Sequence, residues 1–213
     1  MAPVLPGADA RVSALIITPT SFGGSMREVP YRAYARYAVS PLGHVVSALL
    51  RPYAVHTESS GRPVRVTREF VPPPVADAER AQLRTNIEFS MRRVVSDFEW
   101  NGPEIPNEKP PIADIAVGRD GRIWVQSSTL SEEFEPEEPG GPPADRPPPV
   151  KFRSGQKLWD VFERDGRYLG RIAASRAVSL YVMRGNQVWG VVRDEDDVPA
   201  LVRMHIEPAF QQR

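Results

Sequence analysis

A run of acidic residues from Asp194 to Asp197 is the first candidate for binding chemistry in this chain. Carboxylate oxygens are the ligands that hard divalent cations prefer, so Asp194, Asp196 and Asp197 could contact an ion or a small ligand. The run lacks the glycine and the alternate-residue spacing of a calcium-binding loop. A solvated turn between two strands, with Asp197 capping it before Val198-Pro199, is the competing interpretation. We therefore predict no cofactor, and a divalent cation is an open alternative without support from spacing.

The three histidines, His44, His56 and His205, lie far apart in the sequence. A neutral imidazole is a common metal ligand, and neighbouring strands could bring two of these side chains together. No His-Glu-x-x-His or similar metal-binding spacing occurs, so partly buried histidines without a ligand are the competing interpretation. We keep His56 as a candidate ligand contact.

Four arginines at the ends of predicted strands could line a mouth that binds an anion: Arg51, Arg68, Arg122 and Arg171. The alternative is that they are solvated or bridge neighbouring sheets. We keep Arg51 and Arg68 as candidate contacts. The segment Ser154-Gly155-Gln156-Lys157 has the spacing of serine–lysine acyl-transfer enzymes, but it precedes a predicted strand and no partner motif follows. We treat it as a chance match and predict no catalytic residues.

Short apolar strands separated by turn signals form a unit that recurs along the chain, with Gly43, Gly121 and Gly185 in the same position of each repeat. Residues 37–75 and 111–174 each predict four antiparallel strands, and residues 175–213 predict an incomplete last unit. The expected strands are near residues 37–40, 45–49, 53–57, 64–68, 112–117, 122–127, 157–162, 168–173, 180–182, 188–192 and 200–206. Without its inserts, the repeat approaches the ~40–45 residues of a four-stranded propeller blade.

Three further segments lie outside the repeat. Residues 1–36 predict a disordered lead, a strand over 12–18 and a Gly/Ser loop over 21–27. We expect this strand to be the outer strand of a preceding blade; the alternative is that it supplies the outer strand that the last blade lacks. Residues 76–110 predict a helix from about residue 77 to 97 and then a linker; Asp77 is the expected N-cap, and the apolar stripe is expected to lie over the sheets. A partner-binding helix is the alternative. The acidic, Pro/Gly-rich insertion 129–155 is predicted to be disordered.

Composition excludes several classes of protein. Lys+Arg and Asp+Glu are 27 each, which gives a formal net charge of zero and no basic footprint for nucleic acid. The chain has no cysteine, so disulfides and thiol chemistry are excluded. No segment has the apolar length of a transmembrane helix, and the N-terminus lacks the pattern of a signal peptide. Trp124, Trp159 and Trp189 recur at equivalent or adjacent strand positions, which favours packing between units over a ligand-stacking cluster.

Several motifs match those of a known family. They are residues 53–55 leading to Gly61–Arg68, a Pro-rich turn and a helix with Ala78-Glu79-Arg80; residues 111–125; residues 159–170; and residues 188–199. Over residues 30 to 207 the chain resembles the C-terminal part of a family of mostly uncharacterised bacterial six-bladed β-propellers related to NHL-type propellers. The resemblance implies an all-β fold, a partial propeller of about three four-stranded blades with one inserted α-helix.

The same resemblance implies a function. We expect a non-enzymatic binding or interaction scaffold with an unknown protein or small-molecule ligand; the alternative is a metal-assisted hydrolase or lyase of the NHL-like kind. Family members carry export signals, which implies a periplasmic or exported location. Three blades do not close a ring, so we expect contact with missing blades or self-association.

Overall fold

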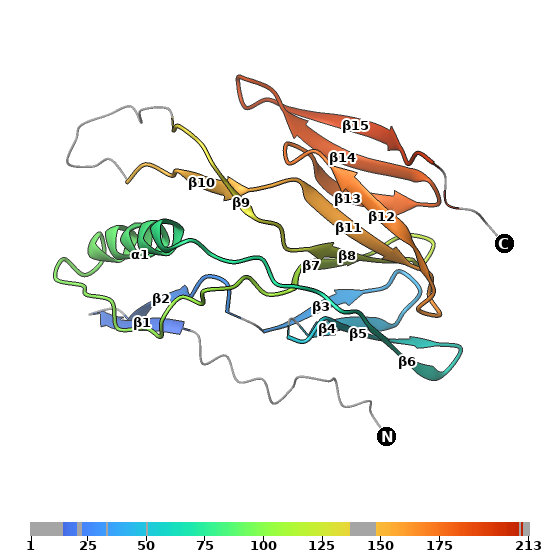
Figure 1. Ribbon diagram of the computed structural model, residues 1–213, viewed down its shortest axis with the longest axis horizontal. Coiled ribbons are helices and arrows are strands. Elements are labelled where there is room, and N and C mark those ends of the chain that lie inside the picture. The colour runs from blue at the N-terminus through green and yellow to red at the C-terminus, as the bar shows by residue number, and fades with distance from the viewer. Residues whose placement is uncertain are drawn as a thin grey trace.

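The computed structural model describes residues 15–20, 23–32, 34–49, 51–136, 148–208 and 210, with side-chain detail from residue 26 onward. It contains one helix and several antiparallel sheets, none of which is closed among the described residues (Figure 1). The predicted all-β class with one inserted helix is confirmed. No helix in the described ranges is both long and apolar enough to cross a membrane.

Three large sheets follow one another along the chain, and each is an antiparallel meander. The first sheet consists of β3 (Ala35–Val39), β4 (Val45–Leu49), β5 (Ala54–Ser59) and β6 (Arg62–Thr67). The second sheet consists of β7 (Ile112–Val117), β8 (Ile123–Ser127), β11 (Lys157–Phe162) and β12 (Tyr168–Ala174). The third sheet consists of β13 (Ser179–Arg184), β14 (Gln187–Arg193) and β15 (Pro199–His205). Each strand lies within a few residues of its predicted position.

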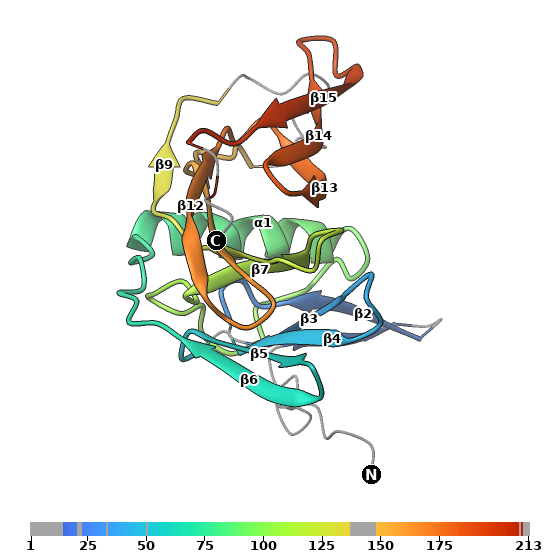
Figure 2. The same ribbon diagram turned by 90° about the vertical axis from the view of Figure 1, so that its right-hand side faces the viewer.

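The second sheet lies between the other two, and Figure 2 shows the first sheet below it and the third above it. Ile123 and Val125 of β8 pack against the first sheet, whereas Trp124 between them packs against the third. All three side chains are fully buried. A strand that is covered on both faces needs apolar side chains on both, which explains why Ile123, Trp124 and Val125 are consecutive apolar residues.

One turn conformation joins strands at four places in the three sheets: residues 40–44, 118–122, 163–167 and 194–198. In each, the first residue donates its N–H to the carbonyl of the fifth, and the fourth donates to the carbonyl of the first, over 2.8 to 3.2 Å. The fourth residue has positive φ: 89° at Gly43, 83° at Gly121 and 88° at Gly166. At Asp197 an aspartate with φ 61° takes this place. Gly43 and Gly121 of the sequence repeat share this turn, whereas Gly185 lies in the shorter turn between Arg184 and Gln187.

The N-terminal segment differs from the prediction. Strands β1 (Leu15–Thr20) and β2 (Gly23–Glu28) form an antiparallel hairpin, so the Gly/Ser loop expected over residues 21–27 is wrong. Backbone pairing does not require an apolar pattern, and the glycines of this segment obscured it. Within the described residues β1 pairs only with β2, and residues 12–14 of the predicted strand lie outside those residues.

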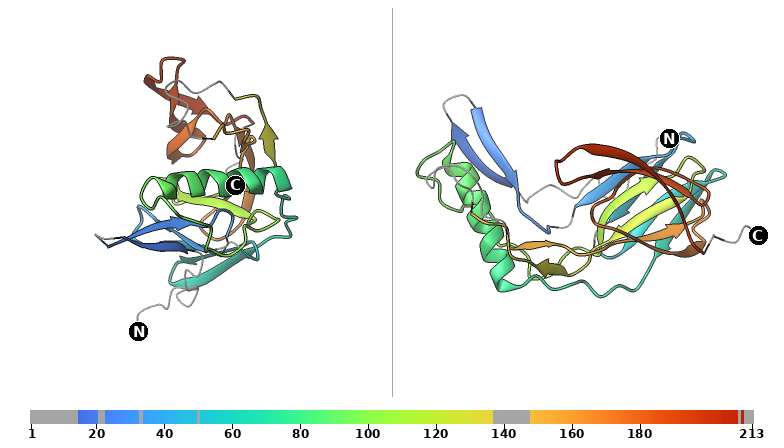
Figure 3. Two further views of the ribbon diagram at one scale, coloured as in Figure 1. Left: turned by 90° about the vertical axis from the view of Figure 1, so that its left-hand side faces the viewer. Right: turned by 90° about the horizontal axis from the view of Figure 1, so that it is seen from above.

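The helix α1 (Asp77–Arg92) is shorter than predicted. Its N-cap is Ala76, which makes no side-chain capping bond, so the assignment of Asp77 as N-cap is wrong. The N–H groups of Val94 and Val95 both reach the carbonyl of Met91, which ends the helix in a tighter turn. The apolar stripe packs with Val29 and the segment after the helix, beside the β1–β2 hairpin, and not over the three large sheets (Figure 3).

The acidic insertion is ordered at its base. Strands β9 (Ser131–Glu133) and β10 (Phe152–Ser154) form a short antiparallel ribbon, which contradicts the disorder predicted for the whole of 129–155. Charge pairing stabilises the ribbon, because Glu132 forms ion pairs with Arg153 and Arg176. Residues 137–147 lie outside the described part of the chain.

Candidate functional site

Two of the predicted arginines converge on one buried carboxylate. Asp160 on β11 has no exposed surface, and it accepts hydrogen bonds from Arg68 after β6 and from Arg171 on β12. Arg171 Nε and one terminal nitrogen lie 3.0 and 3.3 Å from the two carboxylate oxygens. Ser127 Oγ donates at 2.9 Å, and the Tyr53 hydroxyl at 3.3 Å. The first and second sheets are therefore joined through Asp160.

The electrostatics of this cluster favour the charged form of Asp160. Burial acts to raise its pKa, but hydrogen bonds from Arg171 and Ser127 and the charges of Arg171 and Arg68 outweigh burial, so the pKa lies below its ordinary value. Burial raises the pKa of Tyr53, and the neighbouring Asp160 raises it further. The Tyr53 hydroxyl therefore stays protonated and donates a hydrogen bond to Asp160. The cluster has two cations and one anion, and it works as a clamp between sheets.

The other two predicted arginines lie elsewhere. Arg51 forms a half-exposed ion pair with Glu108 at 3.2 Å. Arg122 is buried; it pairs with Glu163 at 3.2 Å and donates to the carbonyl of Gly185 at 3.1 Å. Arg122 thus bridges the second and third sheets. The four arginines do not share one mouth, and Arg68, Arg122 and Arg171 act between sheets.

The histidines are not brought together. His56 lies on β5 opposite Arg65 of β6, and burial followed by the charge of Arg65 lowers its pKa, so it is neutral at pH 7. His44 lies in the turn after β3, and His205 ends β15. Across the described ranges, no group of three or more histidine and acidic side chains is arranged to hold a metal ion.

The acidic run occupies the exposed turn between β14 and β15. The Asp194 carboxylate accepts the backbone N–H groups of Asp196 and Val198 at 3.1 and 2.8 Å. Asp197 pairs with Arg193 at 3.2 Å. Asp194, rather than the predicted Asp197, caps this turn, and its carboxylate is already used by the backbone.

Two of the three tryptophans pack between sheets, and the third is partly exposed. Trp124 and Trp159 meet edge to face with ring centroids 6.4 Å apart, and both pack between the second and third sheets. Trp189 lies on the opposite face of β14 and is half-buried. The predicted packing role is therefore seen for the first two rings and not for the third.

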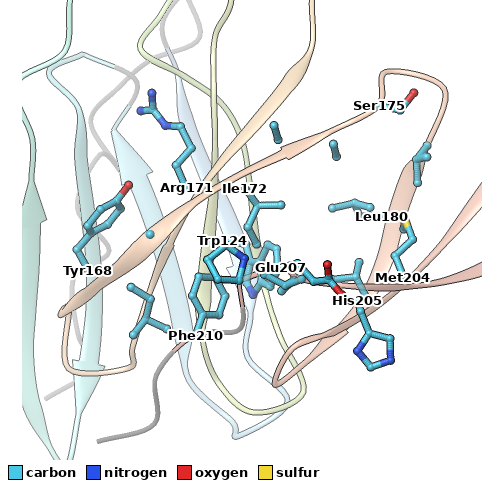
Figure 4. Close-up of a pocket in the computed structure, with 18 of the residues that line it drawn as sticks. Trp124, Tyr168, Arg171, Ile172, Ser175, Leu180, Met204, His205, Glu207 and Phe210 are labelled. Carbon is cyan, nitrogen blue, oxygen red and sulfur yellow. The ribbon is translucent and has the colours of Figure 1, made fainter.

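A cavity of about 890 Å³, lined by both apolar and polar side chains, lies between β12 and the third sheet, and Trp124 is one of the residues that line it (Figure 4). Ile172 lines it from β12, Leu180 from β13 and Met204 from β15. Phe210 lines it as well, and its N–H bonds the side-chain oxygen of Asn186 at 3.1 Å. The volume falls in the range of pockets that bury a ligand or peptide side chains.

The strand beside this cavity has a free edge. Ile206 N–H bonds the carbonyl of Asn186 at 2.9 Å, and Asp194 N–H bonds that of Val198 at 3.2 Å. Because hydrogen-bonded pairs alternate along an antiparallel ladder, the backbone groups of Leu201, Arg203 and His205 point away from β14. No described strand pairs with that edge. The third sheet has three strands where its neighbours have four, and the cavity lies against the face of this sheet that is turned toward β12.

Comparisons of the chain with protein-family models, with curated proteins and with solved structures found no match. Function therefore has to be inferred from the geometry of the chain itself. Sequence reasoning missed Asp160 as the centre of a cluster, and it missed the cavity. The one available signal was a charged residue between Trp159 and Val161, within the otherwise apolar run from Leu158 to Phe162. The incomplete last unit expected over residues 175–213 already implied a sheet without its outer strand, and the third sheet has three strands.

Proposed function

We propose that this chain is a non-enzymatic interaction scaffold of the β-propeller kind, in which each large sheet is a blade. The stacking of three consecutive meanders supports this assignment, as does the contact of β7 with β3 and β4 of the preceding sheet. Within this scaffold, β15 binds a strand from a second copy of the chain. The observation that carries the proposal is the three-stranded third sheet, whose edge strand β15 is unpaired among the described residues and also lines the cavity.

Strand addition fits the chemistry of this edge. An added strand gains affinity from main-chain hydrogen bonds, and its alternate side chains enter pockets on one face. Leu201, Arg203 and His205 supply the outward backbone groups, and the cavity between β12 and β15 supplies a pocket in which apolar side chains such as Ile172 and Met204 take part. The side chain of Leu201 is 75% exposed on the other face, where an added strand with a hydrophobic residue would cover it. An exposed edge of this kind is a template for pairing.

A second copy is the occupant because the chain carries a matching strand. Strand β1, Leu15–Thr20, has six residues and no charged side chain, and β15 has seven residues. Within the described residues β1 has one partner, β2, so its other edge is available. The β1–β2 hairpin lies at the opposite end of the molecule from β15 (Figures 1 and 3), which favours pairing between molecules. When each copy places its β1–β2 hairpin against β15 of the other copy, the two contacts are equivalent, and they form a closed dimer with two-fold symmetry.

The test is the mass of the protein in solution by light scattering over a range of concentrations. We expect a dimer for the unaltered chain. Leu201→Pro removes one outward N–H and leaves the inward ladder of β15 intact, so we expect a folded monomer. Leu201→Thr keeps that N–H, and it serves as the matched control that stays dimeric.

Cross-linking gives a second readout. The chain has no cysteine, so a variant with Thr18→Cys and Arg203→Cys has only these two thiols. We expect disulfide-linked dimers under oxidising conditions, and fewer of them with Leu201→Pro. A monomer at every concentration, with no cross-linked dimer, would refute the second copy as occupant. A dimer that Leu201→Pro leaves unchanged would refute the edge of β15 as its site.

A further inference from the structure

A small basic cleft lies where β3 and β7 begin and β8 ends, and it shares Ser127 with the cluster around Asp160. Its volume is about 230 Å³. Arg32, Arg36 and Lys109 line it, and no aspartate or glutamate does. Hydroxyl groups surround these cations, supplied by two tyrosines, three serines and one threonine: Tyr31, Tyr34, Ser127, Ser128, Ser154 and Thr129. The lining therefore combines positive charge with hydrogen-bonding groups.

Neither arginine of this cleft is paired with a carboxylate in the described part of the chain. The Nε atoms of Arg32 and Arg36 are buried and have no hydrogen-bond acceptor, and neither guanidinium forms an ion pair with any described carboxylate. The guanidinium of Arg36 lies over the Tyr34 ring, 4.5 Å from its centroid, which holds it at the cleft. A buried donor without a partner costs about 1 to 3 kcal/mol, and more when the group is charged. An acceptor that enters the cleft would recover that cost.

The third cation is already compensated. Lys109 is buried, and its Nζ donates to the Thr129 carbonyl at 2.8 Å and to Ser131 Oγ at 2.7 Å. Glu79 lies 3.9 Å away, and it accepts hydrogen bonds from Tyr31 at 2.7 Å and from Ser131 at 2.6 Å. Glu79 therefore balances Lys109. The charges of Arg32 and Arg36 are not balanced by a described carboxylate, and they give the cleft its positive potential.

We propose that this basic cleft binds a small oxyanion group, the phosphate or carboxylate of a ligand, between Arg32 and Arg36. A guanidinium presents its donors in a planar fork that matches both groups, and such charge-assisted bonds are about twice as strong as neutral ones. The volume accommodates one oxyanion group, and the rest of the ligand extends outside. The carboxylates of Glu28 and Asp114 act electrostatically on Tyr34, but neither lines the cleft. They therefore lower the positive potential of the cleft but do not occupy its volume.

The experiment measures binding of inorganic phosphate and of malonate by calorimetry, with the full chain in buffer free of both anions. We expect at least one to bind. Arg36→Gln should weaken it by about tenfold, the loss of one charge-assisted hydrogen bond. Arg36→Lys should restore part of the affinity, since it returns the charge without the fork. Stronger binding of phosphate identifies a phosphorylated ligand, and stronger binding of malonate a carboxylic acid.

The matched control is Arg62→Gln, because Arg62 is exposed on β6 and the variant removes the same charge from a different place. It should leave affinity unchanged. Equal weakening by both substitutions would mean general electrostatic attraction and would overturn the site, as would the absence of binding by both anions at millimolar concentration. If Arg36→Gln unfolds, Arg32→Gln replaces it, with the same expected loss.

Discussion

The clamp at Asp160 is the contact between sheets whose removal should cost most. Substitution Asp160→Asn keeps the size of the side chain but removes the charge, and it places an NH₂ group among donors. The carboxylate accepts six hydrogen bonds from five side chains, which belong to the first and second sheets: Tyr53, Arg68, Ser127, Tyr168 and Arg171. The amide of asparagine cannot accept all six hydrogen bonds, and the guanidinium groups of Arg68 and Arg171 lose the carboxylate that they share.

The magnitude follows from burial. Breaking a buried ion pair by removing one partner costs about 3 to 5 kcal/mol. Asp160 is fully buried, but the side chains of Arg68 and Arg171 are 33% and 35% exposed, so water can partly solvate them after the change. We therefore expect the lower end, about 3 kcal/mol of the free energy of unfolding. For a chain of this size that corresponds to a fall in Tm of about 6 to 12 °C.

The pH dependence provides an independent readout. Because the pKa of Asp160 is lower in the folded chain than in the unfolded one, its contribution to stability is complete above the unfolded pKa of about 3.9. The contribution is lost as the pH falls through the folded pKa. Unaltered protein should thus lose stability below about pH 4 more steeply than Asp160→Asn does.

The assay is urea unfolding at pH 7 and at several values below pH 5, followed by tryptophan fluorescence. Arg51→Ala is the control, since its ion pair with Glu108 is half-exposed and should contribute less than about 1 kcal/mol. In an Arg68→Met background, Asp160→Asn should cost less, because the two residues are in contact. A loss below about 1 kcal/mol at pH 7, or an unchanged acid dependence, would refute the clamp.

Three further predictions concern single residues, and each is checked by urea unfolding. Lys109→Met leaves buried Glu79 without its cation and should cost about 3 kcal/mol; a neutral outcome would mean that water reaches that carboxylate. Trp124→Ala removes a fully buried ring and should cost about 3 to 5 kcal/mol, and a loss under about 1 kcal/mol would contradict its place between the sheets. Asp197→Gly should stabilise the chain by about 0.5 kcal/mol because its φ is 61°, whereas Gly121→Ala should destabilise it; the opposite signs would contradict the shared turn.

The sheets could be predicted because their signals are local. Alternation and turn residues define the strands, and the continuous run Ile123-Trp124-Val125 indicates a strand covered on both faces. Positive φ at Gly121 and Gly166 follows from the same turn signals. The predictions that failed concern segments whose order depends on tertiary contacts. Strand β2 and the β9–β10 ribbon have no apolar pattern and are held by backbone pairing and ion pairs.

The polar clusters could not be predicted from the sequence. Tyr53 and Asp160 are separated by 107 positions, and only the stacking of two sheets brings them together. Arg68 was a candidate as an anion contact, and the structure gives it an internal anion instead. The sequence pattern does not distinguish Arg32 and Arg36, because two arginines near the start of a strand are common. Their significance comes from the absence of a carboxylate in the cleft, and a sequence pattern does not contain that information.

The two proposed binding regions lie at the margins of the stack of three sheets. The second sheet lies between the other two, and its buried Asp160 is paired with Arg171, while β12 and the ends of β7 and β8 line the two proposed binding regions. The free edge of β15 and the basic cleft share no residue. Leu201→Pro should therefore abolish dimers without changing anion affinity, and Arg36→Gln should do the reverse. Loss of both properties in either variant would mean that the dimer itself builds the cleft, in which case strand exchange and anion binding are one function.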